Sequence, residues 1–273
     1  LVLAPIDVAA PVADTLLSGT AAVLTSATLA LGGSFDPMAR TLGLTLSEDP
    51  WEGLDVGTPF DYSRQGILYT PTHLPRPAAG ISEAALDEIL ALTEASGGGV
   101  LGLFSSRRAA QEAAEVLRGA TDLTVYAQGE DQLPTLVEAF TREEDSCLVG
   151  SLSLWQGVDV PGHTCRLVII DRIPFPRPDD PVAQARIEAV TAAGGNGFMS
   201  VAATHAALLL AQGAGRLVRR AGDRGVVAVL DPRLRTARYG AFLARSMPPL
   251  WPTRDRATVL GALERLAASR RNP

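Results

Sequence analysis

The chain has 273 residues, 47% of them apolar and 5% aromatic, and its 24 basic and 30 acidic residues give a net charge of −6. This length allows one large α/β domain or two small ones, with a sizeable core. A negative net charge gives no global signal for nucleic-acid binding, so any such surface must be local. All 24 basic residues are arginine, so the sequence cannot supply the lysine of a phosphate-binding P-loop.

Two cysteines, Cys147 and Cys165, are too few for a disulfide framework, a four-cysteine zinc site or an iron–sulfur cluster. Both lie in apolar, strand-like surroundings, and we expect buried thiols in a reducing compartment. No histidine has a partner at metal-ligand spacing, so we expect no metal site. No apolar run reaches transmembrane length. Because the sequence begins with a leucine in mid-pattern, we expect a soluble, intracellular piece of a longer protein.

The first predicted strand is the apolar run at residues 21–25, which opens into a polar loop. The hydroxyls of Ser26 and Thr28 in this loop could bind phosphates, although a turn or an N-cap is the more common use of such residues. A long connection rich in proline and glycine follows at residues 45–80, with a strand predicted at 67–69.

An amphipathic helix is predicted from the N-cap Ser82 onward, with Asp87 and Glu88 as solvent-facing charges. Glycines at 97–99 end this helix before a strand at 100–104. That strand leads into Ser105, Ser106 and Arg107 at the start of the next helix. Small hydroxyls and arginines at a helix N-terminus suit a phosphate backbone, and simple N-capping is an equally good interpretation.

Strands and helices continue to alternate down the chain, and the strands are apolar throughout. This pattern is typical of a parallel sheet covered on both faces, in which function belongs to loops at the carboxyl ends of the strands. Further strands are predicted at 123–126, 147–150, 167–170 and 226–230, and helices at 133–140, 234–245 and 256–268. The suggestive polar residues after these strands are Gln128, Ser153, Trp155, Asp159 and Arg172.

The stretch from Gln212 to Arg220 concentrates positive charge. If it is helical, Gln212, Arg216 and Arg219 fall within a sector of about 60°. Guanidiniums are planar, permanently charged groups suited to phosphate oxygens, and an arginine can stabilise the transition state of phosphoryl transfer. A solvated basic patch is the alternative for this stretch taken alone.

Taken in order, the loops resemble the motifs of the second, C-terminal RecA-like motor domain of the bacterial DinG helicases, in the branch of superfamily 2 that contains XPD. The similarity spans nearly the whole chain. The matching segments are Thr25–Leu29 for motif III, Leu103–Ser106 for motif IV, Ser153–Gly162 for motif V and Gln212–Arg219 for motif VI, with family-like residues also at Arg172–Phe175, Val229–Arg233 and Tyr239–Gly240. The resemblance implies a RecA-like, doubly wound, mostly parallel β-sheet flanked by helices, a P-loop NTPase fold without its own P-loop.

The resemblance also implies a role for each motif. Gln212, Arg216 and Arg219 would face the triphosphate, with the two arginines as arginine fingers. Gly157 and Asp159 would link the nucleotide to the DNA, and Ser26 and Thr28 would couple closure of the cleft to grip on the DNA. The residues that would line the single-strand track are Ser105, Ser106, Arg107, Gln128, Ser153, Trp155 and Arg172.

One position departs from the family, which usually has glutamate where Gln156 stands. The family resemblance further implies ATP and Mg²⁺, bound mainly by an N-terminal RecA-like domain that this chain lacks, and a possible [4Fe-4S] cluster in that same half. Residues 1–20 would lead from that domain, and 21–273 would form the second motor domain. The implied whole is a 5′–3′ DNA helicase acting on single-stranded DNA in the bacterial cytoplasm, associated with the nucleoid, with no membrane partner.

A second class of function stays open. These loops could belong to a non-catalytic RecA-like module that only binds nucleic acid or another protein. Loss of ATP turnover on substitution of the two arginines would distinguish a motor from such a module. A small-molecule enzyme on a doubly wound sheet would need a dinucleotide fingerprint after the first strand, and the sequence has none.

Overall fold

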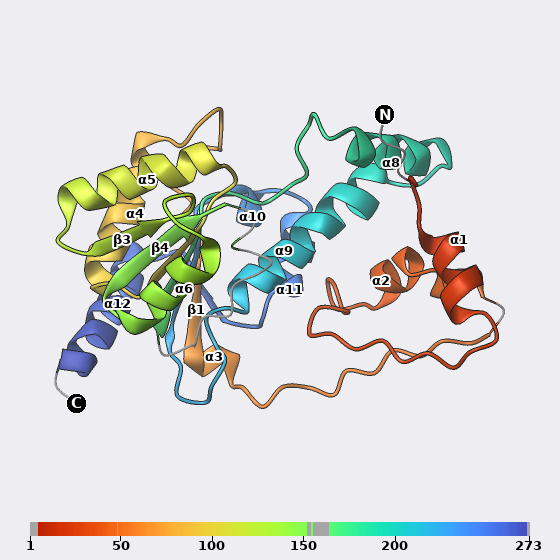
Figure 1. Ribbon diagram of the computed structural model, residues 1–273, viewed down its shortest axis with the longest axis horizontal. Helices are drawn as coiled ribbons and strands as arrows, with labels where there is room; N and C mark the ends of the chain where they lie inside the picture. The colour runs from red at the N-terminus through yellow and green to blue at the C-terminus, as the bar shows by residue number, and fades with distance from the viewer. Residues whose placement is uncertain (1–4, 48, 152–153, 155–163, 272–273) are drawn as a thin grey trace. The chain divides into compact units, whose positions relative to one another are not determined.

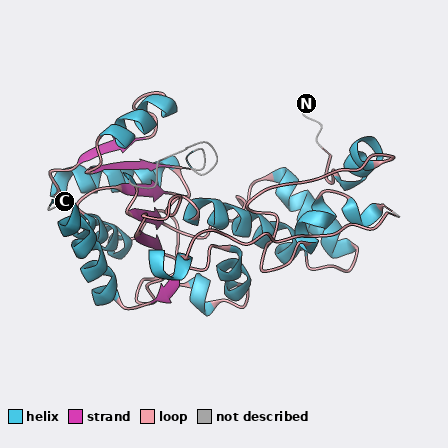
Figure 2. Cartoon of the chain, turned by 90° about the horizontal axis from the view of Figure 1, so that it is seen from below, coloured by secondary structure: helices cyan, strands magenta, loops and turns pink. Residues whose placement is uncertain are grey.

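The computed structural model describes residues 5–47, 49–151, 154 and 164–271. The chain divides into two compact units, which Figures 1 and 2 show. Unit 1 comprises Leu1–Gly57, Pro174–Ala211 and Ala241–Ser246, and unit 2 comprises Thr58–Ile173, Gln212–Gly240 and Met247–Pro273. The motor-domain boundary expected at residue 21 stays a prediction.

Unit 2 contains a seven-stranded sheet in the order β3-β4-β2-β5-β6-β1-β7, and all its described pairings are parallel. Every residue of β2, β4, β5 and β6 is buried, which explains their continuous apolar sequences. The strands are β1 (Gly66–Tyr69), β2 (Val100–Leu103), β3 (Thr124–Ala127), β4 (Ser146–Gly150), β5 (Leu167–Ile170), β6 (Gly225–Val229) and β7 (Trp251–Thr253).

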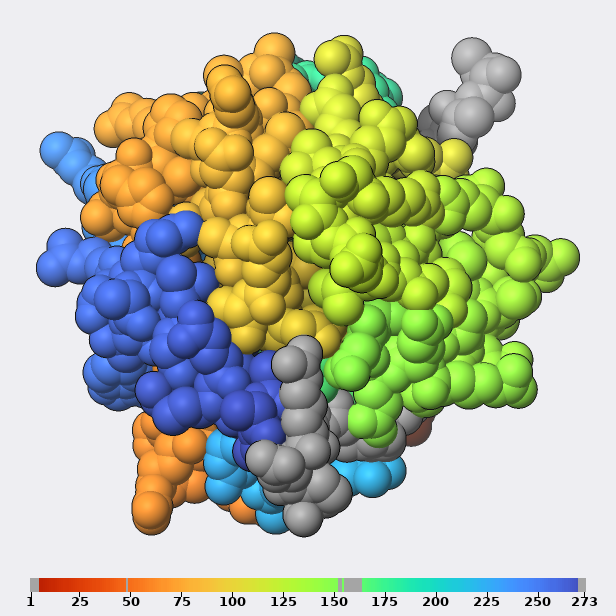
Figure 3. Space-filling model, turned by 90° about the vertical axis from the view of Figure 1, so that its left-hand side faces the viewer, coloured from red at the N-terminus to blue at the C-terminus, as the bar shows by residue number. Residues whose placement is uncertain are grey.

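Helices cover both faces of this sheet. Figure 3 shows α12 (blue) beside α4 (gold), with α5 (yellow-green) next to α4, over one face, and Figure 1 shows α6 on the other. The core of the first face joins Ile89, Leu117 and Leu263 of these helices to Val149 and Val226 of the sheet. The described helices that lie wholly in unit 2 are α3 (Tyr62–Gln65), α4 (Glu83–Ser96), α5 (Arg107–Ala120), α6 (Leu133–Arg142), α10 (Arg233–Thr236) and α12 (Arg256–Arg271). The predicted parallel α/β fold is confirmed.

The ends of α4 follow the predicted signals. The Ser82 hydroxyl accepts a hydrogen bond from the Ala85 N–H, and Gly97 ends the helix in the left-handed region with φ of 59°. Gly98 follows with φ of 101°, and a Cβ atom there would lie 2.5 Å from the Asp145 carbonyl carbon. The glycines therefore end the helix, as expected, and Gly98 also allows close backbone approach to Asp145.

Unit 1 consists of helices and loops. Its α8 begins at the N-cap Asp180, whose carboxylate accepts backbone N–H groups of Val182 and Ala183. Its elements are α1 (Ala9–Val12), η1 (Ala13–Leu17), α2 (Asp36–Thr41), η2 (Leu44–Leu46), α8 (Pro181–Ala192), η4 (Phe198–Ala203), most of α9 (Thr204–Ala214) and α11 (Gly240–Ser246). The helix predicted at 234–245 is therefore two short helices, α10 and α11.

The prediction of a strand at residues 21–25 is wrong. These residues have no regular structure, and Val23 is 90% exposed. A strand needs a neighbour to accept its backbone hydrogen bonds, and none of the described strands pairs with this run. Its apolar side chains therefore remain on the surface of unit 1.

The expectation that Glu88 faces solvent is also wrong. Glu88 is 3% exposed, while its neighbour Asp87 is exposed as predicted. One carboxylate oxygen accepts a hydrogen bond from the Tyr69 hydroxyl at 2.7 Å, and the other accepts one from Nε of Arg256 at 2.7 Å. We call these three residues the Glu88 cluster. It ties α4 to β1 and α12, because burial of a carboxylate requires partners of this kind.

Candidate functional site

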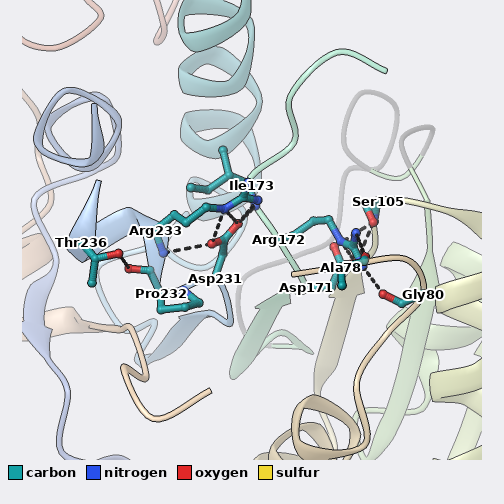
Figure 4. Close-up of polar contacts among 10 residues, drawn as sticks. All are labelled: Ala78, Gly80, Ser105, Asp171, Arg172, Ile173, Asp231, Pro232, Arg233 and Thr236. Atoms are coloured by element: carbon teal, nitrogen blue, oxygen red, sulfur yellow. Dashed lines mark hydrogen bonds and ion pairs between the residues drawn. The ribbon is translucent and has the colours of Figure 1, made fainter. Parts of the chain in front are cut away.

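The loops after β2 and β5 are joined by a buried aspartate (Figure 4). Asp171 directly follows β5 and is 6% exposed. Its Oδ1 accepts the backbone N–H of Ser105 at 2.9 Å, and its Oδ2 accepts the Ser105 hydroxyl at 2.8 Å. Burial raises the pKa of Asp171 above its ordinary value, while the bonds from Ser105 and the charge of Arg172 act in the opposite direction.

Arg172 is engaged by the same cluster. Its Nε donates to Asp171 Oδ2 at 3.3 Å, Nη1 donates to the Ala78 carbonyl at 3.0 Å, and Nη2 donates to the Gly80 carbonyl. A guanidinium has five N–H donors, so these bonds leave two for another ligand. The Ser105 hydroxyl has a single proton, which it gives to Asp171. Ser105 and Arg172, both predicted to contact single-stranded DNA, therefore hold the loops in place.

The start of α5 places Ser106 and Arg107 together on the surface. The Ser106 hydroxyl caps the helix by accepting the Ala109 N–H at 3.1 Å, as the N-cap interpretation predicts. Arg107 is the first helical residue, and its side chain is exposed. The free N–H groups of a helix N-terminus and an exposed arginine are both suited to phosphate oxygens.

Gln128 links the loop after β3 to the loop after β4. Its Oε1 accepts the Ser151 backbone N–H at 2.7 Å and lies 3.1 Å from the Ser151 hydroxyl. A Cβ atom at Gly150 would lie 2.8 Å from this side chain, so glycine at that position lets Gln128 approach the strand end. Gln128 thus holds Ser151 in place. The predicted residues Ser153, Trp155, Gly157 and Asp159 lie outside the described residues, as does Gln156.

A second buried aspartate follows β6 and was missed as a site residue. Asp231 is 0% exposed, and its carboxylate accepts Nε of Arg233 at 2.9 Å and Nη2 of the same residue at 2.7 Å. Its Oδ2 also accepts the Ile173 N–H at 3.0 Å (Figure 4). Ile173 is the last residue of unit 2 before Pro174 opens a segment of unit 1. An acid directly after a buried apolar strand is the signal that both aspartates share.

The helical placement of the arginine stretch is wrong. Helix α9 ends at Ala214, and Arg216 and Arg219 lie in the turns that follow. The Arg216 N–H bonds to the Gly213 carbonyl at 3.1 Å, a three-residue step instead of the four of an α-helix. Gly213 and Gly215 lower the helix propensity at this point. The sector of 60° calculated for an ideal helix therefore does not apply.

An acidic side chain fixes the turn after α9. Asp223 is 5% exposed, and its Oδ2 accepts the backbone N–H groups of Arg219 at 2.8 Å and Arg220 at 2.7 Å. The amide of Gln65 donates to the carbonyls of Arg220, Ala221 and Asp223 at 3.0 to 3.3 Å. These bonds hold the backbone of the turn and leave the Arg219 side chain exposed.

This turn lies at the amino edge of the sheet. Gln65 immediately precedes β1, and the Leu217 side chain packs where Cβ atoms of Gly66 and Gly225 would otherwise stand. Gly66 and Gly225 are the first residues of β1 and β6 and are paired with each other. The arginine turn therefore lies at the amino ends of the strands and the cluster around Asp171 at their carboxyl ends. The sequence pattern did not indicate this separation.

Gln212 stands out for an unmet hydrogen bond. Its Oε1 atom is buried and has no hydrogen-bond partner among the residues that the structure describes. A buried amide oxygen without a donor is uncommon and calls for an explanation, such as an ion, a water molecule or a ligand. Gln212 lies in the last turn of α9 and precedes the arginine turn, and its predicted association with Arg216 and Arg219 at a triphosphate stays a prediction.

The predicted coupling residues form a local turn in unit 1. The Ser26 and Thr28 hydroxyls lie 3.1 Å apart, and the Thr28 N–H bonds to the Ser26 hydroxyl at 3.2 Å. Both side chains are exposed, so this part of the structure agrees with the turn interpretation and leaves the coupling role untested.

Both cysteines are buried thiols, as predicted. Burial raises the pKa of Cys147 to about 12 and that of Cys165 to about 12. The described residues contain no group of three or more His, Cys, Asp or Glu side chains that could hold a metal ion. In the same part of the chain, no helix has the length and apolar character needed to cross a membrane.

A family model described as the helicase C-terminal domain matches residues 89–250, more than half of the chain. The chain belongs to the helicase C-terminal domain family. It is 58% identical over 266 residues to the ATP-dependent helicase DinG of Mycobacterium tuberculosis (strain ATCC 25618 / H37Rv), a match that covers 97% of this chain and 40% of the relative.

A more distant relative is the ATP-dependent DNA helicase YoaA of Escherichia coli (strain K12), with 38% identity over 239 residues, 87% of this chain and 37% of the relative. This helicase C-terminal domain thus spans about two-fifths of the length of these relatives. A solved XPD helicase shares its fold, with a TM-score of 0.51 and 18% identity over 69% of this chain and 36% of that one. The resemblance and the fold class are confirmed, and the individual site residues stay predictions.

Proposed function

We propose that this chain is the C-terminal motor domain of an ATP-dependent 5′–3′ DNA helicase. The observation that carries the proposal is the arginine turn. Arg216 and Arg219 follow α9, and the buried Asp223 holds the backbone N–H groups of Arg219 and Arg220, within a chain 58% identical to a protein named ATP-dependent helicase DinG. A fixed backbone that presents guanidiniums is what stabilisation of a transferring phosphoryl group requires.

The donor set fits a polyphosphate. The chain contributes the permanently charged guanidiniums of Arg216 and Arg219, and Gln212 precedes them in the last turn of α9. ATP, when bound, supplies the phosphoryl-transfer chemistry, with Mg²⁺ as its usual counter-ion. Arg216 and Arg219 would bind the phosphate oxygens and stabilise their charge. Because the chain has no lysine, the P-loop would come from the N-terminal motor domain of the same protein.

The exposed apolar side chains support such a partner domain. Seven of the nine large apolar side chains that the described residues expose lie between residues 6 and 56 of unit 1, with Val23 at 90% and Val56 at 87%. Exposed apolar side chains that gather into one patch mark an interaction site, and these seven come from one segment of the sequence. We infer that this part of unit 1 packs against the N-terminal motor domain, with Ser26 and Thr28 carried on the same segment.

The single-strand track would follow the carboxyl edge of the sheet. Arg107 and the N-terminus of α5 would bind phosphates directly, while Ser105, Gln128 and Arg172 would hold the loops that line the track. Ser153 and Trp155, with Gly157 and Asp159 as the link to the nucleotide, complete the proposed set. The motor would work by alternating closure and opening, in which two domains exchange their hold on the strand.

The test is DNA-stimulated ATP hydrolysis by the full-length protein, comparing wild type with Arg216→Ala and Arg219→Ala. We expect turnover to fall by at least two to three orders of magnitude with DNA binding retained. Arg220→Ala is the matched control, because Arg220 is exposed in the same turn. Wild-type turnover in both variants would contradict the proposal and favour the non-catalytic binding module.

A further inference from the structure

An open hollow lies at the carboxyl end of β7, at the edge of the sheet. Its volume is about 520 Å³, and it is lined by Arg235, Pro252, Thr253, Arg254 and Asp255. All five residues belong to unit 2. None of them is part of the motifs discussed above, so the hollow is a feature that the proposed motor function does not yet use.

The sheet sets the position of the two arginines. The β1–β7 ladder continues past the end of β1, where the Thr70 N–H bonds to the Thr253 carbonyl at 3.1 Å, so Arg254 leaves the sheet at a fixed point. Arg235 comes from α10, directly after β6, and the two strands β6 and β7 flank β1. The hollow therefore stands at the same carboxyl edge as the loops of the proposed track.

Two arginines that neighbour the hollow in the sequence, Arg233 and Arg256, are paired with buried acids, while the two that line it are not. Arg233 is bonded to Asp231, and Arg256 to Glu88. Within the part of the chain that the structure describes, the side chains of Arg235 and Arg254 make no hydrogen bond or ion pair, and both residues are exposed.

Asp255, the one acid in the lining, is occupied by the start of α12. Its carboxylate accepts the Ala257 N–H at 3.1 Å and the Thr258 hydroxyl. The bond from Thr258 lowers the pKa of this carboxyl. The hollow thus presents two unpaired guanidiniums beside a helix N-terminus whose acidic cap is already satisfied, although the chain as a whole has a net charge of −6.

We propose that Arg235 and Arg254 bind phosphodiester groups of a nucleic-acid strand, in a contact outside the helicase motifs. Guanidiniums pair with phosphate oxygens through charge-assisted hydrogen bonds, and an open, polar hollow suits a chain that enters and leaves. From β2 to β7 the sheet order counts four strand spacings, or about 19 Å. The hollow would therefore hold the strand at a second point, away from the N-terminus of α5. This inference rests on the proposed nucleic-acid-binding function.

The test measures binding of a fluorescently labelled single-stranded oligonucleotide to the full-length protein by anisotropy, over a range of salt concentrations. For Arg235→Ala/Arg254→Ala, we expect the slope of log K against log salt to become shallower by about 1.4, since each single-strand phosphate contact contributes about 0.7. At 0.1 M salt this corresponds to binding weaker by about 25-fold. The variant Arg235→Lys/Arg254→Lys keeps both charges and should keep most of the wild-type slope.

Arg265→Ala is the matched control. Arg265 is exposed on α12, nine residues after the first residue of that helix, and therefore about 14 Å along it from the hollow. If the double alanine variant has the same slope as this control, the inference is wrong while the proposed function stands. If the wild type does not bind the oligonucleotide, both fall.

A second arm separates a strand from free phosphate. Thermal stability is measured with inorganic phosphate at constant ionic strength and without DNA. We expect the same phosphate-dependent shift in wild type and in the double alanine variant. A shift that disappears in the variant, with an unchanged salt slope for the oligonucleotide, would assign the hollow to a small anion and overturn the proposal.

Discussion

Removal of the Glu88 carboxylate tests whether the buried cluster holds α4, β1 and α12 together. In Glu88→Ala, the Tyr69 hydroxyl loses the acceptor that it reaches at 2.7 Å, and Arg256 loses the acceptor at 2.7 Å. Tyr69 is 0% exposed, so its hydroxyl has no access to water. Burial first, and then the bond to Glu88, raise the pKa of Tyr69 well above its ordinary value of 10.0.

The two lost bonds differ in magnitude. A buried hydroxyl left without a partner costs about 1–3 kcal/mol. The side chain of Arg256 is 45% exposed, so water can replace its partner, and this part is closer to the value of a surface pair, about 1 kcal/mol or less. We therefore expect Glu88→Ala to lower the free energy of unfolding by about 1–4 kcal/mol.

Equilibrium urea unfolding measures this loss. Asp87→Ala is the control, because it removes the same charge from the exposed neighbouring residue and should change stability by about 0.5 kcal/mol or less. In Tyr69→Phe/Glu88→Ala, the two changes should add to less than their separate effects, since the residues share one hydrogen bond. A loss for Glu88→Ala no larger than that for Asp87→Ala would refute the reasoning.

Two further results are expected. Burial raises the pKa of both Cys147 and Cys165 to about 12, so an alkylating reagent at about pH 8 should label them only after denaturation, and rapid labelling of the folded chain would contradict the burial. Gly98→Ala should destabilise the fold, because φ at this residue is 101° and the new Cβ would lie 2.5 Å from a backbone atom. Gly119→Ala, inside α5 with open space around it, should stabilise the fold by about 0.5–1 kcal/mol. Thermal unfolding that shifts the two variants in the same direction would be inconsistent with these geometries.

The central strands were predictable because burial on both faces leaves a continuous apolar sequence. The run at 167–170 is such a case, and each of its residues is buried in β5. The edge strand β7 was missed, since three residues that include Pro252 do not form an apolar run and proline is tolerated at an edge. The run at 21–25 has the composition of a strand but no partner in the described residues, and composition alone cannot supply one.

Side-chain partners were beyond the reach of the sequence pattern. Helical periodicity places Glu88 beside Asp87. It does not indicate that Tyr69 and Arg256, from distant segments, donate the hydrogen bonds that allow Glu88 to be buried. The acids after β5 and β6 could have been found from their position directly after a buried strand. The turn at Arg216 depends on local glycines and on Asp223, and an ideal-helix calculation ignores both.

The opposite placement of the arginine turn and the Asp171 cluster has a mechanical consequence. Between them stand strands of four or five residues, about 13–17 Å long, whose side chains are packed from both faces. Such a close-packed layer resists compression and deforms little. A force applied to the arginine turn therefore moves the sheet as a rigid body. The Asp171 cluster at the carboxyl ends of the strands is displaced with it, without stepwise rearrangement of individual side chains.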